Sequence, residues 1–148
     1  MGDEPFALAL EALSHKERTV AEMGDWLRTR GVEAEQVEDV VDRLVSTGVL
    51  DDARYARRYA EDKRELQGWG NERIRSALLE RGVCGEDTEA ALGGSDPEQE
   101  LNRAVSLIRR RGPIPRDAQE RQRVLGLLVR RGYDSEVAYE AIRRARHS

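Results

Sequence analysis

Three stretches of the sequence repeat one pattern about every fifty residues, and this repeat constrains the fold more than any other feature. They read WLRTRGVEAEQVEDVVDRL, ALLERGVCGEDTEAAL and LLVRRGYDSEVAYEAIRRA. Their glycines, Gly31, Gly82 and Gly132, lie 51 and 50 residues apart. Apolar residues recur at fixed offsets, four before each glycine (Leu27, Leu78, Leu128) and ten after it (Val41, Leu92, Ile142). A repeat of this length is typical of helical units that stack on one another.

The spacing of apolar residues predicts helices throughout. Apolar residues recur at i, i+3 and i+4, whereas the strict alternation of a half-buried strand is absent. We expect helices over about residues 5–17, from Thr19 onward, and over about 34–47, 52–67, 71–81, 86–92, 97–111, 117–131 and 135–146. The predicted fold class is all-α, with one three-helix repeat in each of residues 1–48, 49–94 and 95–148.

Each repeated glycine fits the end of a helix. A helix commonly ends with a residue at positive φ, which glycine adopts without a Cβ clash. The apolar residue that follows it (Val32, Val83 or Tyr133) can fold back onto the last helical turn. We therefore assign the three glycines a structural role and no role in phosphate binding.

The charge of the chain changes sign from one end to the other. Residues 1–50 carry a net charge of −6, residues 51–95 carry −2 and residues 96–148 carry +4. This gradient predicts a molecule with two electrically different ends. Cys84 is the single cysteine, no apolar run reaches membrane-spanning length, and the N-terminus is acidic. We expect a cytoplasmic monomer without a disulfide or a membrane segment.

The adjacent carboxylates Asp51 and Asp52 begin the stretch DDARYARRYAEDKR. An aspartate at the N-cap accepts a hydrogen bond from the first turn, and one just inside gains from the helix dipole. Tyr55 and Leu66 belong to the apolar face that we expect for this helix. No convergent base, nucleophile, metal-ligand set or phosphate-binding motif accompanies the aspartates, so we predict no catalytic, cofactor-binding or metal residues.

The segment GVLDDARYARRYAEDKRELQGWGNERIRSALLERGV (48–83) resembles the core of the RecX family of recombinase regulators. The family pattern runs from a hydrophobic-Asp-Asp turn through an aromatic-Ala pair, a basic helix and a Gly-containing turn. It ends in an Ile, a Leu and a Gly-hydrophobic pair, which correspond here to Ile74, Leu78 and Gly82-Val83. The flanking repeats extend the resemblance over nearly the whole chain.

The resemblance implies three tandem, helix-turn-helix-like repeats in an elongated, curved array. It also implies a function, namely binding of the RecA recombinase filament on single-stranded DNA. Such binding would inhibit or modulate the assembly, ATPase and strand exchange of the filament, in control of homologous recombination, DNA repair and the SOS response. Members of the family are not enzymes and need no cofactor.

Basic residues and one tryptophan are the candidate contacts to RecA or DNA. They are Arg57, Arg58, Lys63, Arg64, Trp69, Arg73, Arg75, Arg109, Arg110, Arg111, Arg130 and Arg131. For a single arginine, the competing interpretation is a solvated helix face with Glu–Arg pairs of small energy. Trp26 follows the core spacing of its helix, whereas the glycines on both sides of Trp69 leave that residue less constrained.

Two other classes of protein remain open at this point. A helix-turn-helix DNA-binding regulator would place a basic third helix in the major groove, and only residues 135–146, with Arg143, Arg144 and Arg146, have that character. A helical-repeat adaptor would bind a protein partner without a salt-sensitive DNA linkage.

Overall fold

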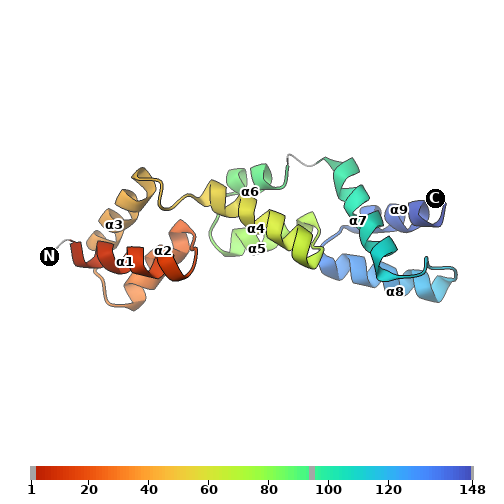
Figure 1. The fold of residues 1–148 in the computed structure, drawn as a ribbon, viewed down its shortest axis with the longest axis horizontal. Helices are drawn as coiled ribbons and strands as arrows, with labels where there is room; N and C mark the ends of the chain where they lie inside the picture. The colour runs from red at the N-terminus through yellow and green to blue at the C-terminus, as the bar shows by residue number, and fades with distance from the viewer. Residues whose placement is uncertain (1–2, 94–95, 148) are drawn as a thin grey trace.

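The computed structural model describes residues 3–93 and 96–147, and within these ranges every regular element is an α-helix. The all-α prediction is therefore confirmed. The helices are α1 (Asp3–His15), α2 (Val20–Thr29), α3 (Ala34–Ser46), α4 (Asp52–Gln67), α5 (Asn71–Glu80), α6 (Gly85–Ala91), α7 (Pro97–Arg111), α8 (Ala118–Arg131) and α9 (Ser135–Arg146). They follow one another in three groups of three along an elongated molecule, with the chain ends at opposite ends (Figure 1).

The helices begin where polar caps were expected. The Thr19 side chain accepts a hydrogen bond from the Glu22 N–H at 3.0 Å, and Glu22 accepts one in return from the Thr19 N–H at 3.0 Å. This reciprocal capping box satisfies two N–H groups that the first turn of α2 leaves without a helical partner. The Asp51 carboxylate accepts from the Arg54 N–H at 3.0 Å and so caps α4. The assignment of Asp51 to capping is confirmed.

Each group of helices encloses its own apolar core. Met23, Leu27 and Leu44 are fully buried in the first cluster. The second cluster contains Ile74 and Leu78 in equivalent places, and the third is built around residues such as Leu128 and Ile142. The unit boundaries at 48/49 and 94/95 remain a prediction, and residues 94–95 lie outside the described part of the chain.

The three repeated glycines end the middle helices α2, α5 and α8 in one geometry. Their φ angles are +85° at Gly31, +89° at Gly82 and +102° at Gly132. In each copy the residue after the glycine donates its N–H to a carbonyl five residues earlier, as Val32 does to Leu27 at 3.1 Å. This is the Schellman arrangement, in which the positive-φ residue turns the chain back over the last helical turn.

The repeats meet end to end through these same middle helices. The N-terminus of α5 meets the C-terminus of α8, where the Gly70 and Glu72 N–H groups donate to the Arg131 and Gly132 carbonyl oxygens at 2.7 and 2.9 Å. A helix end leaves backbone groups without intrahelical partners, and here two helix ends satisfy each other. We call this contact the second junction.

The first junction, between α2 and α5, relies on side chains instead. The Thr19 hydroxyl donates to the Arg81 carbonyl oxygen at 2.7 Å, and the Val20 N–H donates to the Asp52 carboxylate at 2.8 Å. Asp52 therefore connects two repeats, a role that its position in the sequence did not indicate. Burial raises the pKa of Asp52, against the lowering effect of the Val20 hydrogen bond.

The predicted apolar face of α4 is only partly buried. Tyr55 lies half-buried and packs against the second cluster, as expected. Leu66 is 79% exposed, so its assignment to the core face is wrong. The helix turns Leu66 toward solvent near the second junction, where it borders a groove.

Candidate partner-binding surface

The second junction gathers several of the predicted contact residues around two adjoining hollows. The first, which we call the tryptophan groove, is lined by three arginines and one carboxylate, namely Arg73, Arg110, Arg131 and Glu65, together with Trp69, Leu66, Gln67, Gly68 and Leu107. The second, which we call the arginine pocket, is lined by Arg64, Asn102, Arg103, Ser106, Arg109, Arg110 and Tyr133. Gly68 and Arg110 border both hollows, so the two form one continuous basic surface.

Cations already surround the Trp69 ring. The Arg73 guanidinium carbon lies 4.1 Å from the ring centroid and the Lys63 Nζ lies 4.8 Å from it. Tyr59 adds an edge-on contact, with the ring centroids 6.3 Å apart. Cation–π contacts of this kind hold the indole and both basic side chains in place. The ring is thus more constrained than its two flanking glycines suggested.

Arg64 and Arg131 are both engaged in directed hydrogen bonds, Arg64 within the second repeat and Arg131 across the second junction. Arg64 donates to the Asn71 side-chain oxygen at 2.8 Å and to the Leu92 carbonyl oxygen at 3.2 Å. Arg131 donates to the Gln67 carbonyl oxygen at 2.7 Å. Burial lowers the pKa of Arg64, and the neighbouring charge of Arg103 lowers it further. Both arginines therefore have a structural task beside any contact with a partner.

Two of the predicted contact arginines lie away from this surface and are engaged in ion pairs. Arg75 forms a bidentate contact with Glu89 at 2.6 and 3.0 Å, which ties α5 to α6. Arg58 pairs with Glu17 of the first repeat at 2.7 Å. Hydrogen bonding to Glu89 raises the pKa of Arg75, so its charge is committed within the chain.

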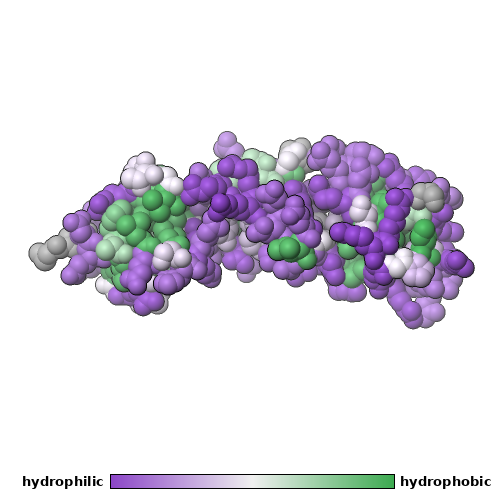
Figure 2. All heavy atoms as spheres, in the orientation of Figure 1, coloured by the Kyte–Doolittle hydropathy of each residue, from purple (hydrophilic) through white to green (hydrophobic). Residues whose placement is uncertain are grey.

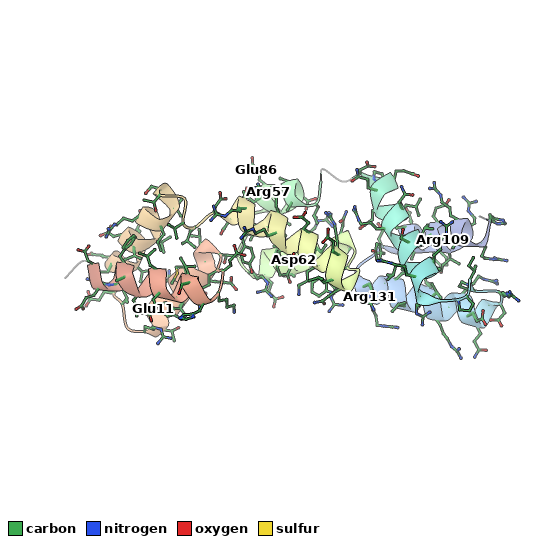
Figure 3. All side chains as sticks on the ribbon, viewed as in Figure 1. Glu11, Arg57, Asp62, Glu86, Arg109 and Arg131 are labelled. Carbon is green, nitrogen blue, oxygen red and sulfur yellow. The ribbon has the colours of Figure 1, made fainter. Side chains whose placement is uncertain are left out.

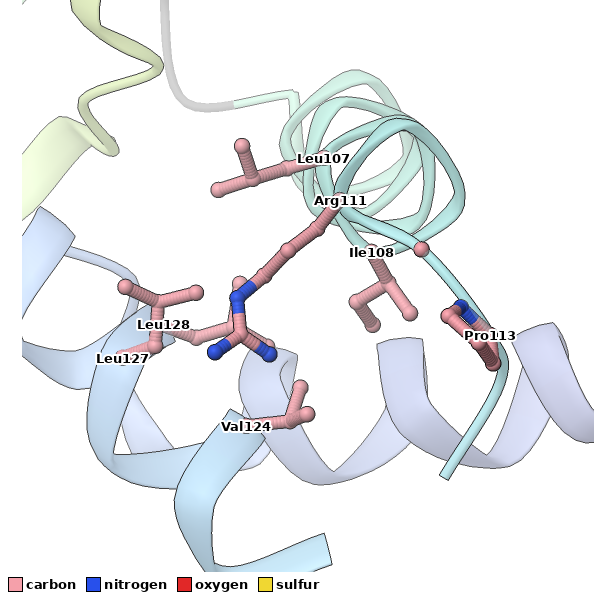
Figure 4. A pocket seen from close by; sticks show the side chains of 8 residues that line it. Leu107, Ile108, Arg111, Pro113, Val124, Leu127 and Leu128 are labelled. Atoms are coloured by element: carbon pink, nitrogen blue, oxygen red, sulfur yellow. The ribbon is translucent and has the colours of Figure 1, made fainter. Parts of the chain in front are cut away.

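The remaining predicted arginines are exposed. Arg109 points away from the body of α7 and Arg57 extends from α4 (Figure 3). Arg130 supplies its carbonyl oxygen to Arg73, at 3.1 Å, and keeps its side chain exposed. Arg111 extends from α7 toward α8, beside Leu128 and Val124, where it lines a small pocket (Figure 4).

The first junction has the opposite electrostatic character. A shallow hollow there is bordered by Glu22, Asp25 and Glu80, with Arg81 as the cation among its lining residues. Arg81 lies 3.4 Å from Glu22, so this cation is already paired. The first junction is therefore acidic and the second is basic, in agreement with the charge gradient along the sequence. Hydrophilic side chains cover most of the face between them (Figure 2).

Sequence reasoning missed two residues of the basic surface, Arg103 and Tyr133, and the buried Glu100 beneath it. Glu100 is 6% exposed and accepts a hydrogen bond from the Asn71 N–H at 2.6 Å. Arg103 lies 3.4 Å from Glu100, and the buried Tyr133 hydroxyl donates to the Gly68 carbonyl oxygen at 3.2 Å. Tyr133 stands where the other repeats have valine, and that departure was the available signal. The other two look like ordinary surface charges in the sequence.

Two features that could carry another function were sought among the described residues, a cluster of metal ligands and a basic helix for reading DNA. There, no three His, Cys, Asp or Glu side chains come together as metal ligands. Two of the three α9 arginines that suggested a DNA-reading helix are paired with acids, Arg143 with Glu140 at 2.7 Å and Arg144 with Glu98 at 2.7 Å. A search of the described residues for a helix long and apolar enough to cross a membrane finds none.

The fold and this surface together define an all-α tandem-repeat protein with charged hollows at the junctions between three-helix units. The sequence matches the first three-helix domain of RecX over residues 6–44, the second over 51–92 and the third over 98–142. The chain belongs to the RecX family, as the resemblance of its central segment indicated. Its relatives are regulatory proteins by name, which assigns it a regulatory role.

Relatives and solved structures agree over almost the full chain. The regulatory protein RecX of Thermobifida fusca is 34% identical over 93% of this chain and 76% of the relative, and that of Mycolicibacterium vanbaalenii is 32% identical over 95% and 82%. A crystal structure of regulatory protein RecX superposes with a TM-score of 0.80 at 26% identity, covering 97% of this chain and 71% of the other. RecX from Lactobacillus salivarius shares the fold, with a TM-score of 0.86 at 19% identity and coverage of 99% and 97%.

Proposed function

We propose that this chain regulates homologous recombination and DNA repair by binding the RecA recombinase filament on single-stranded DNA. Bound there, it limits filament assembly, ATP hydrolysis and strand exchange. The observation that carries the proposal is the series of three RecX domains over residues 6–142, joined by two junctions of opposite charge. An elongated repeat protein presents a long surface, which suits a long periodic partner.

The proposed mechanism is physical obstruction. The array lies along the filament, with the acidic first junction against basic protein surface and the basic second junction toward the DNA phosphates. Charge complementarity of this kind sets orientation and speeds association. Occupying the filament in this way blocks its extension and hinders the conformational cycling that accompanies ATP hydrolysis. The chain acts as a cytoplasmic monomer and performs no chemistry.

The test is the single-stranded-DNA-dependent ATPase of RecA from the same source, titrated with this protein. We expect ATP hydrolysis to fall at substoichiometric protein, because one bound molecule affects more than one filament subunit. A triple variant, Arg109→Ala with Arg110→Ala and Arg111→Ala, should need more protein for the same effect. If equimolar or excess protein changes nothing, while sedimentation shows intact filaments, the proposed function is wrong.

A matched control separates surface charge from position. Arg116, Arg123 and Arg146 are exposed, lie in the same repeat and border neither the tryptophan groove nor the arginine pocket. Replacing all three with alanine removes the same charge as the 109–111 variant. The control should inhibit ATP hydrolysis as the wild type does, and equal losses in both variants would assign the effect to net charge alone.

A further inference from the structure

At both junctions, a carboxylate from the next repeat occupies the start of a middle helix. The Asp52 carboxylate on α4 accepts the Val20 N–H of α2 at 2.8 Å. The Glu100 carboxylate on α7 accepts the Asn71 N–H of α5 at 2.6 Å. Val20 and Asn71 hold equivalent places, each eleven residues before the repeated glycine of its unit. The start of a helix favours such a group, because its N–H groups have no helical partner and its dipole attracts negative charge.

The third such place lies at the outer end of the array, where the described residues contain no further unit to cover it (Figure 1). Arg121 stands there, eleven residues before Gly132. Because α8 begins three residues earlier relative to the glycine than α2 and α5 do, the Arg121 N–H is used within the helix, donating to the Asp117 carbonyl oxygen at 3.0 Å. Its side chain instead borders a hollow between α8 and α9, which we call the end hollow. The hollow is lined by Ala118, Arg121, Gln122, Tyr139, Ile142, Arg143 and Arg146.

The end hollow offers apolar surface that the other repeats lack at this place. Ile142 is buried beside it, and Tyr139, which is 61% exposed, stands seven residues after the repeated glycine. The first and second repeats have Glu38 and Glu89 at that position. Glu89 is bonded to Arg75 at 2.6 Å, whereas in the third repeat an aromatic ring replaces the charge. Tyrosine and arginine are among the residues that most often supply the binding energy of protein interfaces.

The rim of the end hollow is basic. Three arginines line it, and there is no carboxylate among the described residues that do so. Arg143 already has a partner in Glu140 at 2.7 Å, so a ligand would rely on the other two. Arg121 makes one long hydrogen bond, of 3.4 Å, to the Arg116 carbonyl oxygen, and Arg146 is exposed and forms no ion pair within the described residues. Two guanidinium groups beside apolar surface fit a carboxylate that has an apolar side chain next to it.

We propose that the end hollow binds an acidic helical segment of a partner protein. A carboxylate in the first turn of that helix lies against Arg121 and Arg146, in the two-pronged contact that arginine makes with carboxylates. An apolar side chain one turn further along packs on Tyr139. The partner helix thus takes the place that Asp52 and its helix take at the first junction. This interaction goes beyond the proposed function and shares no surface with it, since RecA and DNA are assigned to the two junctions.

The test measures the fluorescence anisotropy of a labelled synthetic peptide titrated with the intact protein. The peptide is an acidic amphipathic helix built from glutamate, leucine and alanine. Two comparison peptides replace every glutamate with lysine or every leucine with alanine. We expect saturable binding of the first peptide and much weaker binding of the other two, because each lacks either the charge or the apolar anchor. No saturable binding of the glutamate–leucine peptide, or equal binding of the lysine peptide, would overturn the proposal.

A pair of arginine variants locates the binding site. Arg121→Ala with Arg146→Ala should weaken binding of the glutamate–leucine peptide about tenfold, since each partly exposed charge pair is worth roughly threefold in affinity. The charge-matched control is Arg116→Ala with Arg123→Ala, because both residues are exposed, belong to the same repeat and lie outside the end hollow. The control should bind the peptide as the wild type does. Equal weakening in both double variants would assign the effect to net charge and overturn the proposal.

A substitution at Tyr139 tests the apolar half of the site. Tyr139→Glu restores the residue type of the other two repeats, and it needs no repacking because the tyrosine is largely exposed. The new carboxylate faces the arginines of the rim, so peptide binding should be lost, whereas Tyr139→Phe keeps the ring and should bind normally. Circular dichroism melting checks that each variant is folded. Wild-type affinity in folded Tyr139→Glu would show that the peptide does not enter the end hollow.

Two further measurements distinguish other occupants. Unlabelled oligothymidylate should fail to displace the peptide, and effective displacement would overturn the proposal in favour of a nucleic acid. Sedimentation equilibrium of the protein alone should give a monomer. Self-association that Tyr139→Glu abolishes would instead assign the hollow to a second copy, whose α1 carries Asp3 and Glu4 in its first turn. Because RecA is absent from all these experiments, failure of the proposed function and failure of the end hollow are separate outcomes.

Discussion

The Gly70 N–H donates a hydrogen bond of 2.7 Å to the Arg131 carbonyl oxygen, so α5 begins where α8 ends. The positive end of one helix dipole meets the negative end of the other, and the contact also satisfies backbone groups that each helix leaves unpaired. The basic surface is built around this contact, because Trp69 and Arg73 stand on the α5 side and Arg131 on the α8 side. The geometry of the surface therefore depends on the backbone of the junction.

A methyl group at Gly70 should separate the two repeats. The φ of Gly70 is −88°, which any residue adopts, but a Cβ there would lie 2.6 Å from the Gly132 carbonyl oxygen. We expect Gly70→Ala to lower the free energy of unfolding by about 2 kcal/mol, the worth of the two backbone hydrogen bonds that it displaces. The measurement is urea unfolding followed by circular dichroism.

Gly85→Ala is the control for this substitution. Gly85 begins α6, and a Cβ there meets no atom within 4 Å among the described residues. Alanine should leave stability unchanged or raise it by up to about 1 kcal/mol, because glycine is the poorer helix former. If Gly70→Ala unfolded at the same urea concentration as Gly85→Ala, the end-to-end contact of α5 and α8 would not exist in solution.

The repeated glycines should differ in their tolerance of alanine. Gly31 and Gly82 have φ angles of +85° and +89°, so each substitution costs about 1 kcal/mol in backbone strain alone. At Gly82 the new Cβ would also collide with the Ala21 side chain across the first junction, whereas in the described residues nothing lies within 4 Å of it at Gly31. We expect Gly82→Ala to be clearly less stable than Gly31→Ala in urea unfolding. Equal losses would argue against a closed first junction.

Helix ends and cores were predictable because the residues that determine them are local in the sequence. Thr19 and Glu22 form a capping box three residues apart. Gly31 marks the end of its helix because glycine readily adopts the positive φ that this position requires. Leu27 and Leu44 lie on the apolar faces that helical spacing defines, and both are buried. Each of these features needs only a short window of sequence to be recognised.

The junctions were not predictable, because they depend on residues far apart in the chain that follow no periodic pattern. Asp52 reaches the Val20 N–H across 32 residues, and Glu100 reaches the Asn71 N–H across 29. Arginines posed a related problem, since a paired arginine and a free one look alike in a sequence. Arg75 was predicted as a partner contact, yet it is held by Glu89 within its own repeat.

Arg75 should therefore contribute to stability and little to binding. It holds the short helix α6 against α5 through its bidentate contact with Glu89, and its side chain is only 27% exposed. We expect Arg75→Ala to lower the free energy of unfolding by about 1 kcal/mol, at the upper end for a partly exposed pair. Oligonucleotide affinity, measured by anisotropy below the unfolding transition, should stay at the wild-type value.

An exposed ion pair provides the comparison for Arg75. Arg28 contacts Asp25 at 2.8 Å, but the two side chains are 58% and 80% exposed. Arg28→Ala should change the free energy of unfolding by less than about 0.5 kcal/mol, because solvent screens such pairs. A loss of oligonucleotide affinity in Arg75→Ala, with stability unchanged, would restore Arg75 to the contact surface.

Glu100 should make stability depend on pH in the acidic range. Burial raises the pKa of this carboxyl above its ordinary value of 4.5, and it outweighs the lowering effects of the Asn71 hydrogen bond and of Arg103 and Arg64. At a pH between the pKa of Glu100 in the unfolded chain and its higher pKa in the folded chain, Glu100 is protonated in the folded chain and ionised in the unfolded one. The contribution of Glu100 to stability is therefore full below pH 4.5 and is lost as pH rises through its folded pKa.

Glu100→Gln tests this expectation because its side chain resembles the protonated acid and does not titrate. Its amide oxygen can still accept the Asn71 N–H, so the second junction keeps its hydrogen bond. In a phosphate-free buffer, the free energy of unfolding of the variant should rise relative to the wild type as pH increases from the acidic range toward neutrality. Glu98→Gln removes an exposed carboxylate from the same helix and should keep the wild-type fall with pH. If the difference in the free energy of unfolding between Glu100→Gln and the wild type stays constant across this range, folding does not favour the protonated form of Glu100. The carboxyl is then ionised in the folded junction and acts as the counter-ion of the arginines around it.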